Sequence, residues 1–143
     1  MAYIDGMKKL NQRLYKLAEG KAVADAMGKC LALVEGESKE NCPVQTGELR
    51  RSITSRMKQE PTLIQGEVFS DKEYAVYVHQ GTGIYTENGD GRDTPWSYQD
   101  ADGNWHTTLG QHPNPFMERA LDENKEKCLQ YIKDSIRREI QND

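Results

Sequence analysis

Hydrophobic residues in the first forty positions recur three and four residues apart, which is the pattern of an amphipathic helix. Gly20 interrupts this pattern, and it either separates two helices or bends a single one. Pro43 cannot donate a backbone hydrogen bond and disfavours the helical conformation at Cys42, so we expect the helix to end near Asn41. The hydrophobic positions are Met7, Leu10, Leu14, Leu17, Val23, Met27, Cys30 and Val34.

Residues 52–57 and 62–70 change to an alternating pattern, which is typical of strands with one buried face. Ile53 and Met57 would share one face of the first strand, and Ile64 and Val68 one face of the second. Residues 58–61 supply a turn, so the two segments predict an antiparallel hairpin with its other face in water. The polar positions of that face are Ser52, Thr54, Arg56, Gln65 and Glu67.

A second hairpin is predicted after a loop rich in glycine and aspartate, "TENGDGRDTP". The short aromatic stretches "WSYQD" and "NWHTT" flank Ala101, Asp102 and Gly103. An Asp-Gly turn between two such stretches is one of the stronger local signals for a hairpin.

The end of the chain predicts a long helix from about Asn114 onward. Pro115 stands in its first turn, where a missing backbone N–H removes no helical hydrogen bond. The hydrophobic stripe of this helix is Met117, Leu121, Cys128, Ile132, Ile136 and Ile140.

Helices at both ends with antiparallel strands between them favour an α+β fold. We expect the long N-terminal and C-terminal helices to pack on one face of a small antiparallel sheet. The chain has 143 residues, the length of one ordinary domain, so we expect residues 1–143 to form a single domain.

Composition and charge narrow the range of partners. The chain has 19 lysine and arginine residues against 23 acidic ones, a net charge of −4, which argues against a dedicated binder of nucleic acid or anionic lipid. No hydrophobic run approaches the ~18 residues of a membrane span, and the first ten residues lack the apolar core of a signal peptide. We therefore expect a protein made and kept in a cytosol-like compartment, with no membrane partner.

The three cysteines are Cys30, Cys42 and Cys128. They lack the spacing of a zinc site or a disulfide scaffold and are expected to be buried free thiols.

The stretch "EYAVYVHQGTG", residues 73–83, joins a histidine to a Gly-Thr-Gly turn. Read as an alternating segment, it would place Glu73, Ala75, Tyr77 and His79 on one face. A catalytic histidine needs a nucleophile or an orienting carboxylate, and an ordinary polar sheet edge shows the same pattern. The turn lacks the longer glycine pattern of a phosphate loop, so its glycines are interpreted as conformational.

Two alternative functions depend on other polar residues. His79, His106 and His112 lie on three different predicted elements, and nothing in their spacing brings them together as metal ligands. A small metal-dependent nuclease using His79, His106 and an aspartate remains an alternative. The acidic residues of segment 90–102 lack the bidentate glutamate of a calcium loop. We therefore predict neither a metal nor a cofactor.

The basic cluster of the chain is Arg50, Arg51, Arg56 and Lys58. Its simplest interpretation is a solvated strand face that nearby glutamates balance. The alternative is a patch that faces DNA or a partner protein.

Three short motifs follow one another along the chain. They are "CPVQTGELRRSI", "YAVYVHQGTG" and "HPNPFM". In this order, with a hairpin after the first, they resemble motifs of a family of tailed-phage minor structural proteins, the neck, head–tail joining or tail-completion components. The residues that carry the resemblance are Pro43, Thr46, Gly47, Leu49, Arg50, Ser52, Ile53, Tyr74, Ala75, Tyr77, Val78, Gly81, Thr82, Gly83, Pro113, Pro115 and Phe116.

The resemblance implies a structural virion protein of siphophages or prophages, without enzymatic activity or cofactor. Such a protein would be made in the bacterial host cytoplasm and would assemble as a ring at the head–tail junction or the head-proximal end of the tail. Its partners would be other copies, head-connector proteins and tail proteins, while DNA would pass by without specific binding. A closed ring needs two different patches on each subunit. The candidates are the aromatic hairpin at Trp96, Tyr98 and Trp105 and the exposed side of the first helix.

Overall fold

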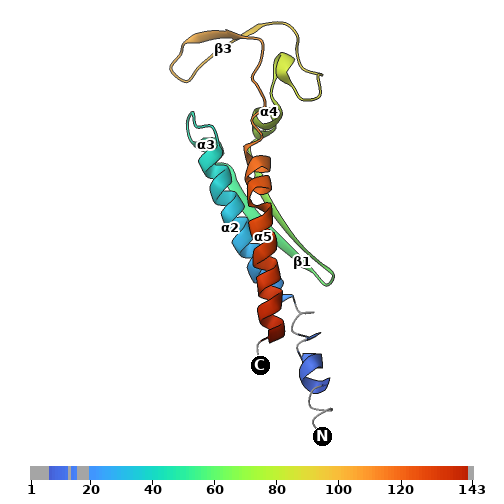
Figure 1. Cartoon of the computed structure of the whole chain (residues 1–143). Coiled ribbons are helices and arrows are strands. Elements are labelled where there is room, and N and C mark those ends of the chain that lie inside the picture. Colours follow the sequence, from blue (N-terminus) through green and yellow to red (C-terminus); the bar gives the residue numbers. More distant parts are fainter. Residues whose placement is uncertain (1–6, 13, 16–19, 142–143) are drawn as a thin grey trace.

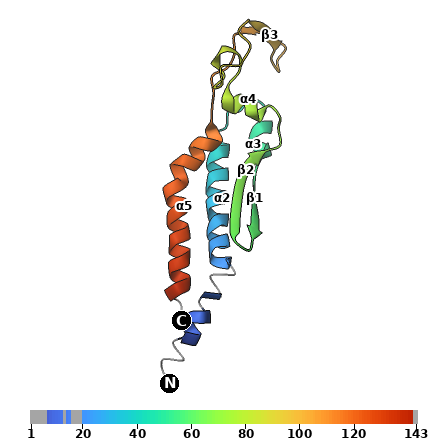
Figure 2. The same cartoon turned by 90° about the vertical axis from the view of Figure 1, so that its right-hand side faces the viewer.

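The computed structural model describes residues 7–12, 14, 15 and 20–141. Two long helices, α2 (Lys21–Asn41) and α5 (Phe116–Gln141), run antiparallel side by side and give the molecule an elongated shape (Figure 1). A hairpin of β1 (Ile53–Glu60) and β2 (Leu63–Ser70) lies against α2, which therefore forms the middle layer (Figure 2). This arrangement confirms the predicted α+β class, with long helices at both ends packed together and against a small antiparallel sheet.

The boundaries of α2 follow from glycine at one end and proline at the other. Gly20 has a φ of 73° and is the N-cap of α2. A helix cannot continue through this left-handed conformation, so α2 is a separate helix that begins after Gly20. At the other end Cys42 is extended, as Pro43 requires of its neighbour, and the predicted end at Asn41 is confirmed. The predicted hydrophobic position Leu17 lies outside the described residues.

Small side chains bring α2 and α5 close together. α2 buries four residues spaced four apart, and α5 buries Ala120 and Asn124. The Asn124 side-chain amide donates to the Ala120 carbonyl at 2.7 Å and to the Glu37 carboxylate of α2. The predicted stripe of α5 is only partly buried, because Leu121 and Ile140 are exposed. The four α2 positions are Ala26, Cys30, Val34 and Ser38.

The register of the first hairpin confirms its predicted faces. Ile53 pairs with Ser70 and Met57 pairs with Gly66, so the odd positions of β1 and the even positions of β2 point to the same side. That side faces α2, since a Cβ on Gly66 would meet side chains of that helix. The first strand begins one residue later than predicted, because Ser52 ends the short helix α3 (Glu48–Ser52). It also continues to Glu60, which pairs with Leu63, so the turn predicted over residues 58–61 is confined to 61 and 62.

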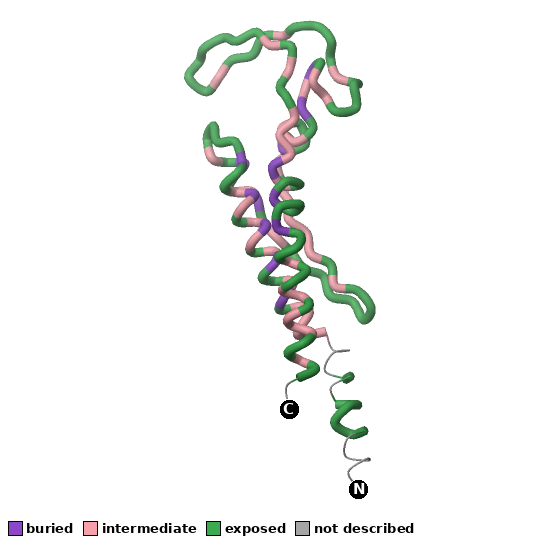
Figure 3. Tube along the Cα trace, viewed as in Figure 1, coloured by how far each residue is buried: buried purple, intermediate pink, exposed green. Residues whose placement is uncertain are grey.

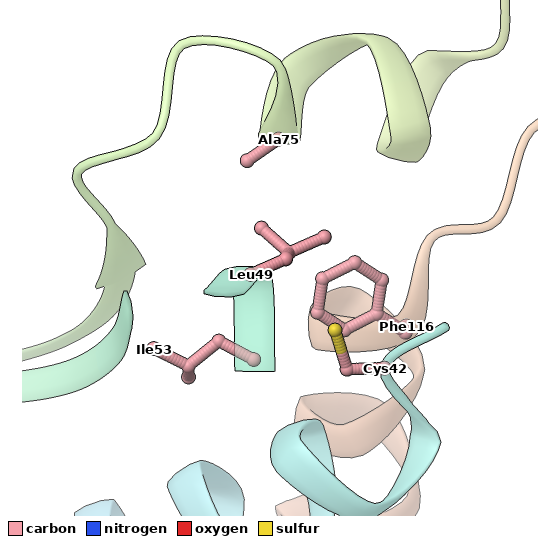
Figure 4. Packing of buried hydrophobic residues seen from close by; sticks show 5 residues of the cluster. All are labelled: Cys42, Leu49, Ile53, Ala75 and Phe116. Atoms are coloured by element: carbon pink, nitrogen blue, oxygen red, sulfur yellow. The ribbon is translucent and has the colours of Figure 1, made fainter. Parts of the chain in front are cut away.

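The core of the molecule lies at the end of α2 and α5 that is farthest from the chain termini. Five buried residues from different elements meet there (Figure 4). Phe116, the first residue of α5, is fully buried and packs with residues that come before and after the hairpin. The cluster therefore joins both helices, α3 and the start of β1 at one point. Its members are Cys42, Leu49, Ile53, Ala75 and Phe116.

Residues 75–80 form a short helix, α4 (Ala75–Gln80), and not an alternating segment. Ala75 is buried and Val78 packs against the core cluster, a spacing of three that suits one helical turn. Tyr74 and Tyr77 are exposed instead. The prediction of a shared face for alternate residues of this segment is therefore wrong, and the small and branched side chains, not the tyrosines, anchor it to the core.

Beyond α4 the chain makes an excursion and returns beside its own starting point. The excursion contains the 3-10 turn η1 (Gly83–Tyr85) and the second hairpin, β3 (Trp96–Gln99) with β4 (Trp105–Thr108). Of these two, the hairpin confirms the prediction for this region. Thr82 donates its N–H to the Gln111 carbonyl at 2.9 Å, and Ile84 donates to the Leu109 carbonyl at 3.1 Å. The excursion stands beyond the end of the helices (Figure 1), and we refer to residues 83–110 as the head.

Glycine is required where the two ends of the head cross. Gly83 has a φ of 63° and Gly110 a φ of 140°. A Cβ on Gly83 would overlap the Leu109 carbonyl oxygen, and a Cβ on Gly110 would overlap that of Thr82. The interpretation of the Gly-Thr-Gly turn as conformational is confirmed.

Candidate interaction surface

A groove of about 780 Å³ lies between the core end of the helices and the head. One wall is segment 43–49, which precedes and begins α3, and the other includes Trp96 and Tyr98 of β3. Tyr74 and Thr82 also line it. The groove therefore brings together residues of the first motif, the second motif and the aromatic hairpin, which lie far apart in the sequence.

The first motif forms a tight turn followed by one helical turn. Thr46 Oγ1 accepts the Glu48 N–H at 3.4 Å, and Gly47, with a φ of 80°, precedes α3 in the left-handed conformation. Leu49 then points into the core (Figure 4). Arg50 donates to the Cys42 carbonyl at 3.5 Å, so this arginine holds the turn against the end of α2 and is not part of a strand face.

The three aromatic residues of the hairpin do not share one face. Trp96 pairs with Thr108 and Tyr98 with His106, whereas Trp105 pairs with Gln99. Because side chains alternate along a strand, Trp105 points to the side opposite Trp96 and Tyr98. Trp105 is the more exposed residue, so the predicted aromatic patch is divided between the groove and the outer face of the head.

Asp100 holds the turn of the aromatic hairpin. Its Oδ1 accepts the N–H groups of Asp102 at 3.0 Å and Asn104 at 2.8 Å, and its Oδ2 lies 2.7 Å from Nε2 of His106. The hydrogen bond with His106, followed by that from Asn104, lowers the pKa of Asp100 to about 2. The carboxylate is therefore charged throughout the physiological range and fixes the loop between β3 and β4.

The structure places the three histidines in three different surroundings. The His79 ring lies 6.3 Å from the Phe116 ring, centroid to centroid, and the His112 ring lies 3.9 Å from that of Tyr85. His106 pairs with Asp100. Within the described part of the chain, no three His, Cys, Asp or Glu side chains are grouped so that they could hold a metal ion.

The basic cluster is divided between two elements, and its two strand residues are paired with acidic groups. Arg56 lies 2.7 Å from the Glu67 carboxylate, and Lys58 lies 3.0 Å from that of Glu60. Arg56 also stacks over the Phe69 ring at 4.7 Å. Arg50 and Arg51 belong to α3, away from these strand positions. The interpretation of a balanced, solvated strand face therefore fits Arg56 and Lys58, whereas Arg50 and Arg51 lie outside that face.

The three cysteines are free thiols. Cys30 and Cys42 are buried and Cys128 is half-buried, so the prediction holds fully for the first two. Burial raises the pKa of Cys30, to about 12, and also that of Cys42. Such thiols are poor nucleophiles at neutral pH. Across the described residues, no helix combines the length and hydrophobicity that a membrane crossing requires.

Sequence reasoning missed the crossing of residues 109–111 with the second motif. Gln111 lines the groove and binds Thr82 twice, because its N–H also donates to Thr82 Oγ1 at 2.9 Å. The sequence signals for this close packing are the glycines Gly110 and Gly91. A Cβ on Gly110 would overlap the carbonyl oxygen of Thr82, and a Cβ on Gly91 would overlap that of Gly83.

Comparison with known proteins identifies one family. The family described as "Bacteriophage HK97-gp10, putative tail-component" matches residues 8–81, just over half of the chain. This segment contains the first motif and nearly all of the second, while the head and "HPNPFM" follow it. No curated protein and no solved structure matches the chain. The chain therefore belongs to the HK97-gp10-like family of phage tail components.

Proposed function

We propose that this tail component assembles as a ring at the phage head–tail junction, or at the head-proximal end of the tail, and connects the head connector to the tail. The whole chain, residues 1–143, would act as one neck or tail-completion domain in the virion. Its partners would be copies of itself, head-connector proteins and tail proteins. DNA would pass through the ring without specific binding, which suits a chain with a net charge of −4.

The groove between the first motif and the head is the observation that supports binding to neighbouring virion proteins. It is open, it is walled by backbone turns on one side, and it exposes Trp96 and Tyr98 on the other. Aromatic side chains in such settings commonly anchor protein–protein contacts. A segment of a neighbouring virion protein would bind here and would contact all three parts of the surface at once.

The test is genetic and uses the phage that encodes this chain. Deleting the gene is expected to give DNA-filled heads and separate tails, visible by electron microscopy, and the wild-type gene supplied in trans is expected to restore joined particles. Trp96→Ala combined with Tyr98→Ala should fail to restore them, although the purified variant keeps its helical circular-dichroism signal.

Two controls separate this function from the alternatives. Trp105→Ala removes an aromatic residue of the same hairpin from the opposite face and should restore joining. His79→Ala should also restore it, whereas a nuclease that uses His79 would lose activity. Normal tailed particles from the deletion mutant would contradict the proposed role.

A further inference from the structure

The N-terminal arm, residues 7–12, 14 and 15, is a helix whose hydrophobic side chains are uncovered. Met7, Leu10 and Leu14 lie three and four residues apart, and each exposes about half of its surface, 51% for Leu10. The arm lies beyond the hairpin end of the α2–α5 pair, and its tube is coloured as exposed in Figure 3. An amphipathic stripe of this kind is normally covered by a partner surface.

A hydrophobic groove of about 450 Å³ runs along α5 and is also uncovered. It lies between α2, β2 and α5, and its lining includes Leu31, Val68, Leu121 and Ile132. Leu121 exposes 52% of its surface. The arm stripe is ~10 Å long from Met7 to Leu14, at 1.5 Å per helical residue. The groove follows α5 for about twice that distance, so its length is sufficient for the stripe.

The charges of the arm and the rest of the chain are opposite. Residues 7–15 contain three lysine and arginine residues and no acidic one, a net charge of +3, so the other residues carry −7 within the total of −4. Glu118 lines the groove, and Asp122 follows one turn later on α5. Lys125 lies on the same side of that helix and offsets part of this local negative charge. The electrostatic attraction is therefore between the net charges of the arm and of the rest of the chain, and not within one ion pair.

We propose that the arm of one copy packs into the α5 groove of a neighbouring copy. This contact rests on the proposed ring and names its subunit interface. Arm and groove are different surfaces, so each copy would give its arm to one neighbour and receive an arm from the other, which is the head-to-tail arrangement that closes into rings. The head and its aromatic groove would remain free for connector and tail proteins.

The first experiment measures self-association of the full chain by sedimentation. The wild type is expected to form oligomers, more strongly at low salt, because the charges of the arm and body attract. Leu10→Asp combined with Leu14→Asp should weaken association at least about tenfold, since it removes hydrophobic burial from the contact. Val76→Asp is the matched control, because Val76 is 54% exposed but lies on α4 and does not line the groove. This variant should associate as the wild type does.

The second experiment locates the contact directly. A copy with Leu10→Cys and a copy with Leu121→Cys are mixed and oxidised with copper phenanthroline, and a disulfide-linked heterodimer is expected. All copies also carry Cys128→Ser, because the half-buried Cys128 thiol lines the same groove. The pair Leu10→Cys and Val76→Cys should give none. Equal crosslinking by both pairs would overturn the proposal. A single chain that carries both Leu10→Cys and Leu121→Cys should link to other copies, and a disulfide formed within that chain instead would also overturn it.

The results also distinguish this contact from the proposed function. Oligomers that persist in the arm variant would overturn the arm–groove contact but not the ring. A wild-type chain that stays monomeric at high concentration and gives no crosslink would overturn the contact between free copies, while the genetic test of head–tail joining would still decide the proposed function.

Discussion

At the scale of single residues, two glycines of the head show how local geometry sets the path of the chain. Gly83 and Gly89 both have left-handed backbone, with φ of 63° and 68°. A Cβ on Gly83 would overlap the Leu109 carbonyl, whereas a Cβ on Gly89 would meet no atom within 4 Å. A substitution at either position would therefore cost backbone strain, but only a side chain at Gly83 would also overlap other atoms.

Gly83→Ala is expected to lower the free energy of unfolding by about 3 kcal/mol or more, because left-handed strain adds to a steric overlap with backbone. Gly89→Ala should cost only about 1 kcal/mol, from strain alone. Thermal unfolding of both variants checks this. Similar losses in the two would show that the crossing at Leu109 relaxes easily.

The carboxylate of Asp100 makes the aromatic hairpin sensitive to acid. Its pKa in the fold is about 2, against an ordinary value of 3.8, so its contribution to stability is complete above pH ~4 and is lost as the pH falls from there to about 2. We expect the tryptophan fluorescence of the head to change over this interval.

His106→Ala removes the largest cause of that lowered pKa and should move the acid transition of the hairpin to higher pH. Asp102→Asn is the control, since Asp102 contributes its backbone N–H to the turn. NMR titration of the Asp100 carboxyl group measures the shift directly, and an unchanged value in His106→Ala would contradict this account.

At the scale of elements, the interface between α2 and α5 contains a buried hydroxyl group, that of Ser38, which adds no stability. Ser38 is fully buried, and its Oγ has no hydrogen-bond partner among the described residues. Ser55 differs, because its hydroxyl donates to Glu35 of α2 at 2.6 Å and ties the hairpin to the helix.

Ser38→Ala should therefore raise the free energy of unfolding by about 1 kcal/mol, because it removes an unsatisfied polar group and improves helix propensity. Ser55→Ala should lower it by a similar amount. Chemical denaturation of the two variants tests this, and a loss of stability in both would mean that the Ser38 hydroxyl has a partner in solution.

The elements that could be predicted are those with long periodic patterns and strong end signals. α2 ends where Pro43 requires, and both predicted hairpins form, the second around its expected turn. The turn of the first hairpin lies at residues 61 and 62 and not over 58–61, because β1 continues to Glu60. α4 could not be predicted because six residues are too few for periodicity to separate a helix from a strand, and the buried pair Ala75 and Val78 decides its form only through the core. The interaction groove depends on the crossing at Gln111, a contact between distant segments that no local pattern encodes.

At the scale of the whole molecule, the head and the helical body meet through few connections. The two ends of the head lie side by side because Thr82 bonds to Gln111 and Ile84 to Leu109. The core cluster contains no residue of the head, and the family match ends at residue 81, before the head begins. The body therefore holds the fold, and the head adds one wall of the interaction groove.

Replacing residues 84–109 by a short glycine-rich turn should consequently leave the body folded, with its free energy of unfolding within about 1 kcal/mol of the wild type, because a shorter connection costs less closure entropy and the lost head contacts are few. The variant should still self-associate through the arm but should fail to join heads to tails in the phage. Circular dichroism, sedimentation and the complementation assay measure the three properties separately. Unfolding of the body would show that the head is part of the core, and restored joining would show that the aromatic wall is not the partner surface.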